Sequence, residues 1–231
     1  MDIQGIIETD RQLLGVFNGN HSAFFDTLMA TLTAGPTWIP LYIALLYLVV
    51  KNNETITQIM VILCSVALCL FITVFVTEEV VKPMVARPRP LVDPEWGYLW
   101  HVVGERKANA YSFFSAHASN TFGIAVLLSL IIRNKVFTWL MVTWSLINCY
   151  TRLYLAMHYP SDIVVGLAFG ALAGTLSYLV YSLAFRQVSA RQHFISSQYT
   201  KSGYNLTDID IVAFVLVATI FLAIIISLMM Q

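Results

Sequence analysis

Long apolar runs, separated by short polar connections, dominate the pattern of this chain. A helix needs about 20 mostly apolar residues to cross a bilayer, and six stretches approach or reach that length. The predicted spans are His21–Val50, Thr57–Val81, Ala118–Ile132, Val136–Leu155, Ile163–Phe185 and Ile209–Met230. Gly35-Pro36 interrupts the first of them, which predicts an interfacial helix leading into a shorter span. We expect an all-α, polytopic membrane bundle of about six transmembrane helices, forming a single domain over residues 1–231.

The segment before the first span shows a different pattern. Over residues 2–19, apolar side chains recur at nearly helical spacing among polar neighbours: Ile3, Ile6, Ile7, Leu13, Leu14 and Phe17. Such a pattern predicts a helix lying in the plane of the lipid headgroups. The segment begins acidic and lacks the order of a cleaved signal, so we expect the first membrane helix to direct insertion as well.

Composition agrees with a protein dissolved in lipid. The chain is 58% hydrophobic and 11% charged, whereas soluble domains average about 45–50% and about 25%. The formal net charge is zero, so no basic excess points to a nucleic-acid partner. Cys64, Cys69 and Cys149 lie in apolar runs without metal-site spacing, and we expect them to be packing residues. We expect no metal, no cofactor and no obligate protein partner.

The connections between spans fall on two faces. Residues 82–114, residues 156–161 and the N-terminal segment share one face. The other face carries basic residues with few acids near them: Lys51, Arg133, Lys135, Arg186, Arg191 and Lys201. By the positive-inside tendency this second face is cytoplasmic. The protein is therefore expected in the cell (inner) membrane, with its first face on the extracytoplasmic side.

Two further patterns concern the glycines and the tryptophans. Gly166, Gly170 and Gly174 recur every four residues and form a smooth helical stripe that another helix can approach closely. The tryptophans fit interfacial aromatic belts better than a cofactor site; they include Trp38, Trp96, Trp100, Trp139 and Trp144.

Charged and nucleophilic residues gather in three short blocks at the same end of their helices. The first block runs from Lys82 to Arg89-Pro90, the second is residues 114–117, and the third is residues 151–162. Charges at membrane depth are costly, so their clustering indicates a functional site. Glu78 and Glu79 precede Lys82 by four and three residues, so a helical salt bridge to Lys82 is the preferred interpretation of these acids. Arg87 is interpreted as an interfacial anchor.

The residue types suit phosphoryl transfer. Lys82, Arg89 and Arg152 supply three cations, enough to neutralise a phosphate dianion and the charge of its transition state. His158 and Asp162 are separated by one turn, so the carboxylate can orient the imidazole and leave its other nitrogen free to attack phosphorus.

The second block adds an acid and an anion site. His117 stands at the start of the third span, where it can protonate a leaving oxygen. The backbone amides around Ser115, Ala116 and His117 can hold phosphate oxygens, because helix N-termini favour anions. An ordinary helix cap is the alternative role of Ser115.

Taken in order, Lys-x6-Arg-Pro, Ser-x-His and Arg-x5-His-x3-Asp resemble the three-part signature of the type 2 phosphatidic acid phosphatase superfamily. The resemblance implies a phosphatase of lipid phosphates that needs no metal for hydrolysis. It makes His158 the nucleophile, His117 the acid and Asp162 the partner of His158, and it assigns phosphate binding to Lys82, Arg89, Ser115, Ala116 and Arg152. The chain departs from the family pattern at Ala116, where glycine is usual, and at Thr151, where serine is usual.

The resemblance leaves the substrate and the final acceptor open. Undecaprenyl diphosphate, phosphatidylglycerol phosphate and lipid A phosphate all present the same reacting group. A phosphotransferase that uses a polyprenyl diphosphate donor shares the first step with a hydrolase. A binder or transporter of lipid phosphates would use the same cations, but it has no need of a nucleophile and an acid. The loop before the second block contains polar residues, among them His101, Glu105 and Arg106. They either select the headgroup or belong to an ordinary solvated loop.

Overall fold

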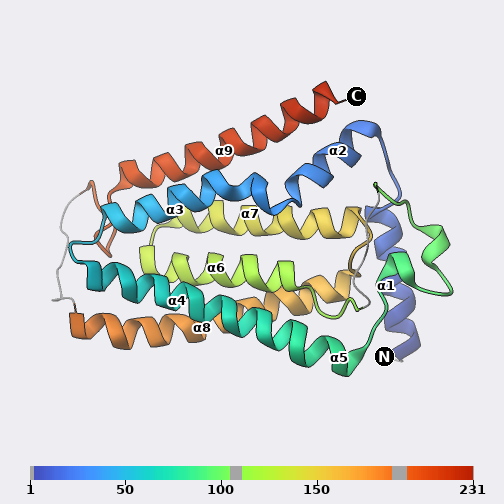
Figure 1. Ribbon diagram of the computed structural model, residues 1–231, viewed down its shortest axis with the longest axis horizontal. Coiled ribbons are helices and arrows are strands. Elements are labelled where there is room, and N and C mark those ends of the chain that lie inside the picture. Colours follow the sequence, from blue (N-terminus) through green and yellow to red (C-terminus); the bar gives the residue numbers. More distant parts are fainter. Residues whose placement is uncertain (1–2, 105–110, 189–196, 231) are drawn as a thin grey trace.

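A computed structural model describes residues 3–104, 111–188 and 197–230, with residues 3, 4 and 6 described by their backbone only. Its long helices run side by side, as Figure 1 shows. The α-helices are α1 (Ile3–Phe17), α2 (Ala23–Leu32), α3 (Ile39–Lys51), α4 (Ile56–Val74), α5 (Lys82–Val85), α6 (Ala116–Ile132), α7 (Lys135–Tyr154), α8 (Pro160–Val188) and α9 (Leu206–Met229). The predicted all-α membrane bundle is confirmed.

The helices differ in how well they suit a bilayer. Within the described residues, three helical runs are long and apolar enough to cross a membrane: Ile56–Val85, α8 and α9. The pair formed by α2 and Gly35–Lys51 gives a fourth if its two parts count as one span. The apolar helix α6 has only 17 residues, and α7 does not qualify although it was predicted to span. Many α7 side chains are buried against other helices, so this helix can be less apolar than one facing lipid.

The predicted break in the first span is confirmed. A 3-10 turn, η1 (Gly35–Trp38), joins α2 to α3, and the two parts are bent by 68°. Freed carbonyls at the end of α2 are satisfied by side chains, since Thr37 Oγ1 donates to Thr31 O at 2.6 Å and Trp38 Nε1 donates to Leu32 O at 2.9 Å. These bonds make the bend a defined corner.

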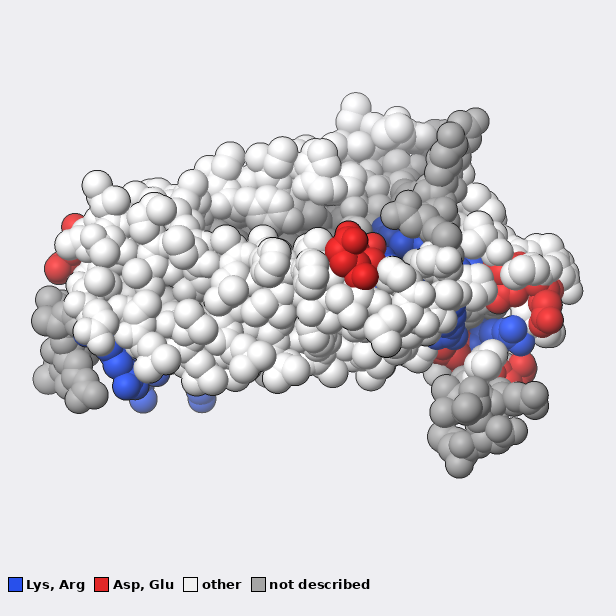
Figure 2. Space-filling view, turned by 60° about the horizontal axis from the view of Figure 1, so that its bottom comes forward, with Lys and Arg blue, Asp and Glu red and all other residues white. Residues whose placement is uncertain are grey.

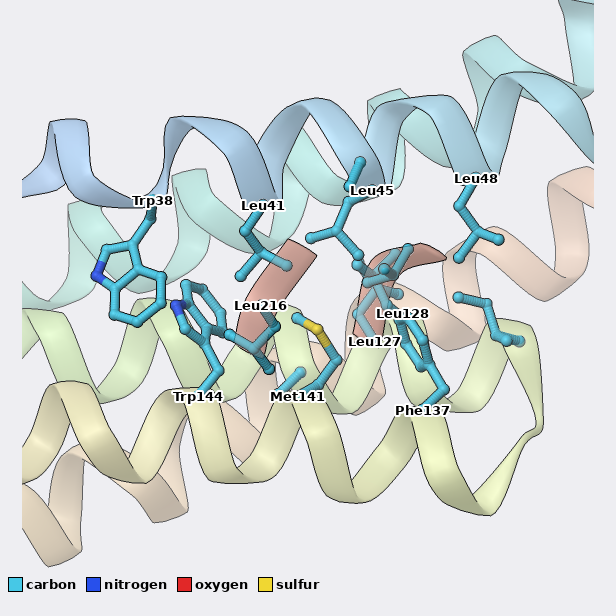
Figure 3. Close-up of a cluster of buried hydrophobic side chains, with 14 of the residues drawn as sticks. Trp38, Leu41, Leu45, Leu48, Leu127, Leu128, Phe137, Met141, Trp144 and Leu216 are labelled. Carbon is cyan, nitrogen blue, oxygen red and sulfur yellow. The ribbon is translucent and has the colours of Figure 1, made fainter. Parts of the chain in front are cut away.

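The core lies between α3, α6, α7 and α9, and Figure 3 shows its central side chains. Trp38 and Trp144 are almost fully buried there and meet edge to face, with ring centroids 6.0 Å apart. Their assignment to an interfacial belt was therefore wrong, because large aromatics also fill cores. Trp139, by contrast, is 69% exposed. Of the cysteines, Cys69 and Cys149 are buried as expected, whereas Cys64 is exposed.

The glycine stripe on α8 packs against α6, as predicted. A Cβ added to Gly170 would meet the Ser119 carbonyl oxygen at 2.5 Å, and one added to Gly166 would meet the Ser115 carbonyl oxygen at 2.8 Å. Neither distance is sterically possible, so glycine is required for the two backbones to lie this close. The stripe thereby sets the start of α6 directly against the start of α8.

Helix α1 lies across one end of the bundle, transverse to the long helices (Figure 1). The described parts of the connections from α5 to α6 and from α7 to α8 reach the same end. Leu14 is completely buried there, and Asp10 is 5% exposed. A space-filling view shows a broad uncharged band between two charged ends (Figure 2). The arrangement is that of a surface helix and a polar cap above a lipid-facing body.

Candidate active site

A cavity of about 190 Å³ lies where α4 leads into α5, where α6 begins and where α7 ends. A water molecule occupies about 30 Å³ of liquid, so the cavity has room for a phosphate group. Its walls combine residues from all three sequence blocks: Glu78, Lys82, Arg89, Ala116, His117, Arg152, Met157 and His158. The two imidazoles and three cations, far apart along the chain, therefore surround a single space.

The backbone that presents these side chains departs from regular helix. Between α4 and α5, residues Phe75–Val81 form a π-helical segment, η2, and Lys82 follows directly after it. Ala86 and Ala156 both adopt left-handed φ values, of 49° and 47°. The first ends α5 shortly before Arg89, and the second turns the chain shortly before His158. π-Segments and strained residues of this kind concentrate at functional sites.

His158 is held between a cation and a carboxylate. Its Nε2 lies 3.3 Å from Arg89 Nη1, and its Nδ1 lies 3.5 Å from Asp162 Oδ2. Because a guanidinium can only donate, Nε2 is the accepting nitrogen and the ring proton belongs on Nδ1, toward Asp162. The Asp162 contact is longer than a normal hydrogen bond. This tautomer directs the Nε2 lone pair into the cavity.

The surroundings of His158 favour its neutral form. The side chain is 1% exposed and lies in the connection between α7 and α8. Burial, followed by the positive charges of Arg152, Arg89 and Lys82, holds the pKa of His158 well below its usual value of 6.5. A neutral imidazole is the form that can act as a nucleophile.

The cations are buried and oriented by local partners. Lys82 Nζ donates to Glu78 Oε1 at 2.5 Å, which confirms the predicted helical salt bridge. Arg89 Nη1 also donates to the Met157 carbonyl oxygen at 3.0 Å. Arg152 Nη1 donates to Thr33 Oγ1 at 3.0 Å, at the corner between α2 and α3. These bonds hold Lys82, Arg89 and Arg152 in place, each at most 7% exposed.

His117 stands between two cavities. It lines the charged cavity and also a second cavity of about 500 Å³, whose other walls come mainly from α3, α4, α6 and α7. The second cavity is largely apolar, with walls that include Trp38, Leu45 and Ile62. A group bound at this junction would have its anionic part beside the cations and its apolar part between the helices.

Ser115 and Ala116 differ in position. Ala116 lines the charged cavity, whereas Ser115 is fully buried and is not among the residues that line it. The Ser115 hydroxyl accepts from Ala118 N at 3.4 Å, so it caps α6. Its backbone N–H donates to Asp162 O at 3.1 Å, which ties the starts of α6 and α8 together. In this structure Ser115 occupies the capping role.

Sequence reasoning missed a buried network behind His158. Arg87 Nη1 donates to Asp162 Oδ1 at 2.9 Å, and Arg87 Nη2 donates to Asp10 Oδ2 at 2.6 Å. Asp10, on α1, also accepts from the Ser161 backbone N–H at 2.8 Å. Arg87 is therefore not merely an interfacial anchor, because it joins α1 to the carboxylate beside His158. The one sequence signal was an acidic residue within an amphipathic helix.

The loop before α6 contains the residues that were considered for selecting the headgroup. His101 is described and lies away from the charged cavity, whereas Glu105 and Arg106 lie outside the described residues. Arg191, used in the topology argument, lies outside them as well.

Comparisons with known proteins agree with this geometry. A lipid A 4'-phosphatase of Bacteroides thetaiotaomicron is 35% identical over 77% of this chain and 79% of its own length. One from Porphyromonas gingivalis is 32% identical over 78% and 75%. An undecaprenyl-diphosphatase of Sulfolobus acidocaldarius is 27% identical over 74% and 78%.

A solved structure and a family model agree with these sequence relatives. The crystal structure of Aquifex aeolicus LpxE superimposes with a TM-score of 0.53 at 21% identity, covering 72% of this chain and 92% of that one, and so shares the fold. A sequence model of the PAP2 superfamily matches residues 58–186, which include every residue lining the charged cavity. This chain belongs to the PAP2 superfamily.

Proposed function

We propose that this protein is a membrane lipid phosphatase that acts through a phosphohistidine at His158. The observation that carries the proposal is that His158 and His117 line one cavity together with Lys82, Arg89 and Arg152. Three cations can hold a phosphoryl group, and two imidazoles can flank its phosphorus atom. A binding protein has no need of that pair.

The first step transfers the phosphoryl group to the enzyme. When phosphate enters, the Arg89 guanidinium turns from His158 Nε2 to the phosphate oxygens, and the freed Nε2 attacks phosphorus. The bond between phosphorus and the leaving oxygen breaks, and protonated His117 gives its proton to that oxygen. Lys82, Arg89 and Arg152 balance the charge on the equatorial oxygens. Asp162 stabilises the positive charge that the His158 ring acquires.

The second step restores the enzyme. A water molecule gives a proton to His117, now the base, and attacks phosphorus as the P–N bond breaks. Inorganic phosphate leaves, and His158 returns to its neutral form. The pKa of His158 supports this sequence, because burial and the neighbouring cations keep the ring unprotonated before attack.

For the substrate we propose a lipid A-type phosphate. The 35% and 32% identical relatives are lipid A 4'-phosphatases, and the apolar cavity beside His117 suits the acyl part of a lipid. The reaction takes place on the extracytoplasmic side of the inner membrane, since the opposite end carries Lys51, Arg133, Lys135 and Arg186.

The experiment compares the activity of the purified protein on three lipid substrates. Phosphate release is measured from lipid A, undecaprenyl diphosphate and phosphatidylglycerol phosphate in matched detergent micelles, with His158→Ala as the control. The proposal expects the highest kcat/KM on lipid A and no release above background by the variant. A higher kcat/KM on undecaprenyl diphosphate would overturn the substrate assignment, and normal turnover by His158→Ala would overturn the mechanism.

A further inference from the structure

A second cluster of ligating side chains lies at the active-site end, outside the charged cavity. It consists of His21 before α2, Asp26 in the first turn of α2, and His101 in the loop after η4 (Gly97–Leu99). One nitrogen of each ring and one oxygen of the carboxylate all lie within 4.8 Å of one another. None of the three residues lines the charged cavity. No metal was expected from the sequence, in which His21 and His101 stand far apart.

The donor atoms of this cluster lie close enough together to share one ion. His21 Nδ1 lies 3.3 Å from Asp26 Oδ1, and His101 Nε2 lies 3.1 Å from Asp26 Oδ2, the other oxygen of the same carboxylate. Zinc binds nitrogen and oxygen at about 2.0–2.2 Å, so neighbouring ligands of a tetrahedral zinc lie about 3.3–3.5 Å apart. The two imidazoles are stacked with centroids 3.7 Å apart, so one ring must turn out of the stack before both nitrogens face the same ion.

The contacts of His21 orient its ring toward Asp26. Its Nε2 makes a close contact with the Asn18 carbonyl oxygen. A carbonyl only accepts, so Nε2 donates to it, and Nδ1 is the ring nitrogen that faces the Asp26 carboxylate. An imidazole N–H donated to a backbone carbonyl is the usual outer support of a metal ligand.

Hydrogen bonds with surrounding residues fix the positions of Asp26 and His101. Tyr154 Oη donates to Asp26 Oδ1 at 2.7 Å. The Asn18 side chain accepts from the His101 backbone N–H at 2.9 Å and donates to the Tyr154 carbonyl oxygen at 2.6 Å. These bonds tie the segment before α2, the loop after η4 and the end of α7 together. A ligand set fixed in this way loses little freedom when an ion binds.

We propose that His21, Asp26 and His101 bind a divalent transition-metal ion, with Zn²⁺ as the best fit. Two imidazoles and one carboxylate make a ligand set used for zinc, and three protein ligands leave a fourth position for water. The His101 side chain is 44% exposed and that of Asp26 is 22% exposed, so an ion reaches the site from solvent. The ion clamps the loop after η4 to the start of α2 and takes no part in the hydrolysis. The site is independent of the proposed function.

The test measures metal content and stability together. Purified full-length protein is stripped with a chelator, dialysed against micromolar Zn²⁺ and analysed by elemental mass spectrometry. The proposal expects about one Zn²⁺ per chain and a higher unfolding temperature with Zn²⁺ than without it. His21→Ala and His101→Ala should lose both effects. Tyr154→Phe, which removes only the supporting bond to Asp26, should weaken binding about 10–100-fold.

The control is His158→Ala, which removes an imidazole from the charged cavity and should still bind Zn²⁺ like the wild type. Loss of the ion from His158→Ala with retention by His101→Ala would place the metal in the catalytic cavity and overturn the proposal. A wild-type protein that binds no Zn²⁺ would overturn it as well. His101→Gln gives a second measurement at the more exposed ligand if His101→Ala fails to fold.

Discussion

Arg87 Nη1 lies 2.9 Å from one oxygen of Asp162, whose other oxygen lies 3.5 Å from His158 Nδ1. The carboxylate is completely buried, and an unpaired carboxylate in such a place takes up a proton. Arg87 therefore favours the charged form of Asp162 and fixes its orientation without lining the cavity itself. It is a positioning residue for the nucleophile.

We expect Arg87→Ala to lower kcat about 10²-fold, the size of effect that a misplaced catalytic group produces. KM should change little, because Arg87 does not line the charged cavity. Arg89→Ala should instead change both constants, since Arg89 does line it. Steady-state kinetics on one lipid substrate separate the two patterns. Arg11→Ala, which removes a cation stacked on Trp96 at the same end, is the control; an equal loss of kcat in that variant would contradict the role of Arg87.

Helix α1 is attached to the active site through Asp10. Its carboxylate accepts from Arg87, from the Ser161 backbone and from the Ser161 hydroxyl. Asp10→Asn removes the charge from this buried network, and we expect it to lower the free energy of unfolding by about 1–3 kcal/mol. Glu8→Gln changes an exposed acid on the same helix and should cost almost nothing. Unfolding midpoints in detergent measure both, and equal midpoints for the two variants would show that Asp10 does not anchor α1.

Close contact between α6 and α8 depends on Gly170. An added methyl group would lie 2.5 Å from the Ser119 carbonyl oxygen, so the helices must move apart. We expect Gly170→Ala to lower the free energy of unfolding by about 1–3 kcal/mol and to reduce kcat by shifting His117 relative to His158. Gly15→Ala is the matched control, because a methyl group there meets nothing within 4 Å. A Gly170→Ala protein as stable as Gly15→Ala would contradict the packing.

The depressed pKa of His158 makes stability depend on pH. Below pH 6.5 the unfolded chain binds a proton at this residue that the folded protein does not, until the pH reaches the lowered folded-state pKa. Stability is therefore unaffected by His158 above pH 6.5 and falls by about 1.4 kcal/mol per unit below it. His158→Gln should remove this component. Unfolding midpoints from pH 7.5 to 5 should fall less steeply in the variant, and parallel curves would show that the folded His158 titrates normally.

The sequence was most informative where chemistry requires particular residues at particular spacings. The order of Lys82, Arg89, His117, Arg152 and His158 sufficed to predict that they share one space, because helix ends in a bundle meet at its two faces. The bend at Gly35 was equally predictable, because proline and glycine interrupt a helix at their own positions.

What the sequence could not supply depended on tertiary contacts. Arg87, which binds Asp10, and His101, which stacks on His21, each lie more than 70 residues away from that partner, and nothing in the local pattern identifies them. The π-segment before Lys82 has the sequence FVTEEVV, in which no proline or glycine marks a departure from regular helix. The interior position of Trp144 was missed for a related reason: its hydrophobicity suits lipid and core equally, and only packing decides between them.

The most direct test of the central claim is to trap the phosphoryl group on the enzyme. Protein is mixed with a lipid substrate carrying radioactive phosphate, quenched with alkali within milliseconds to seconds, digested and analysed by mass spectrometry. The mechanism predicts an acid-labile phosphohistidine at His158, absent from His158→Ala, that forms and decays at rates consistent with turnover. Label at another residue, or full turnover by His158→Ala without label, would contradict it.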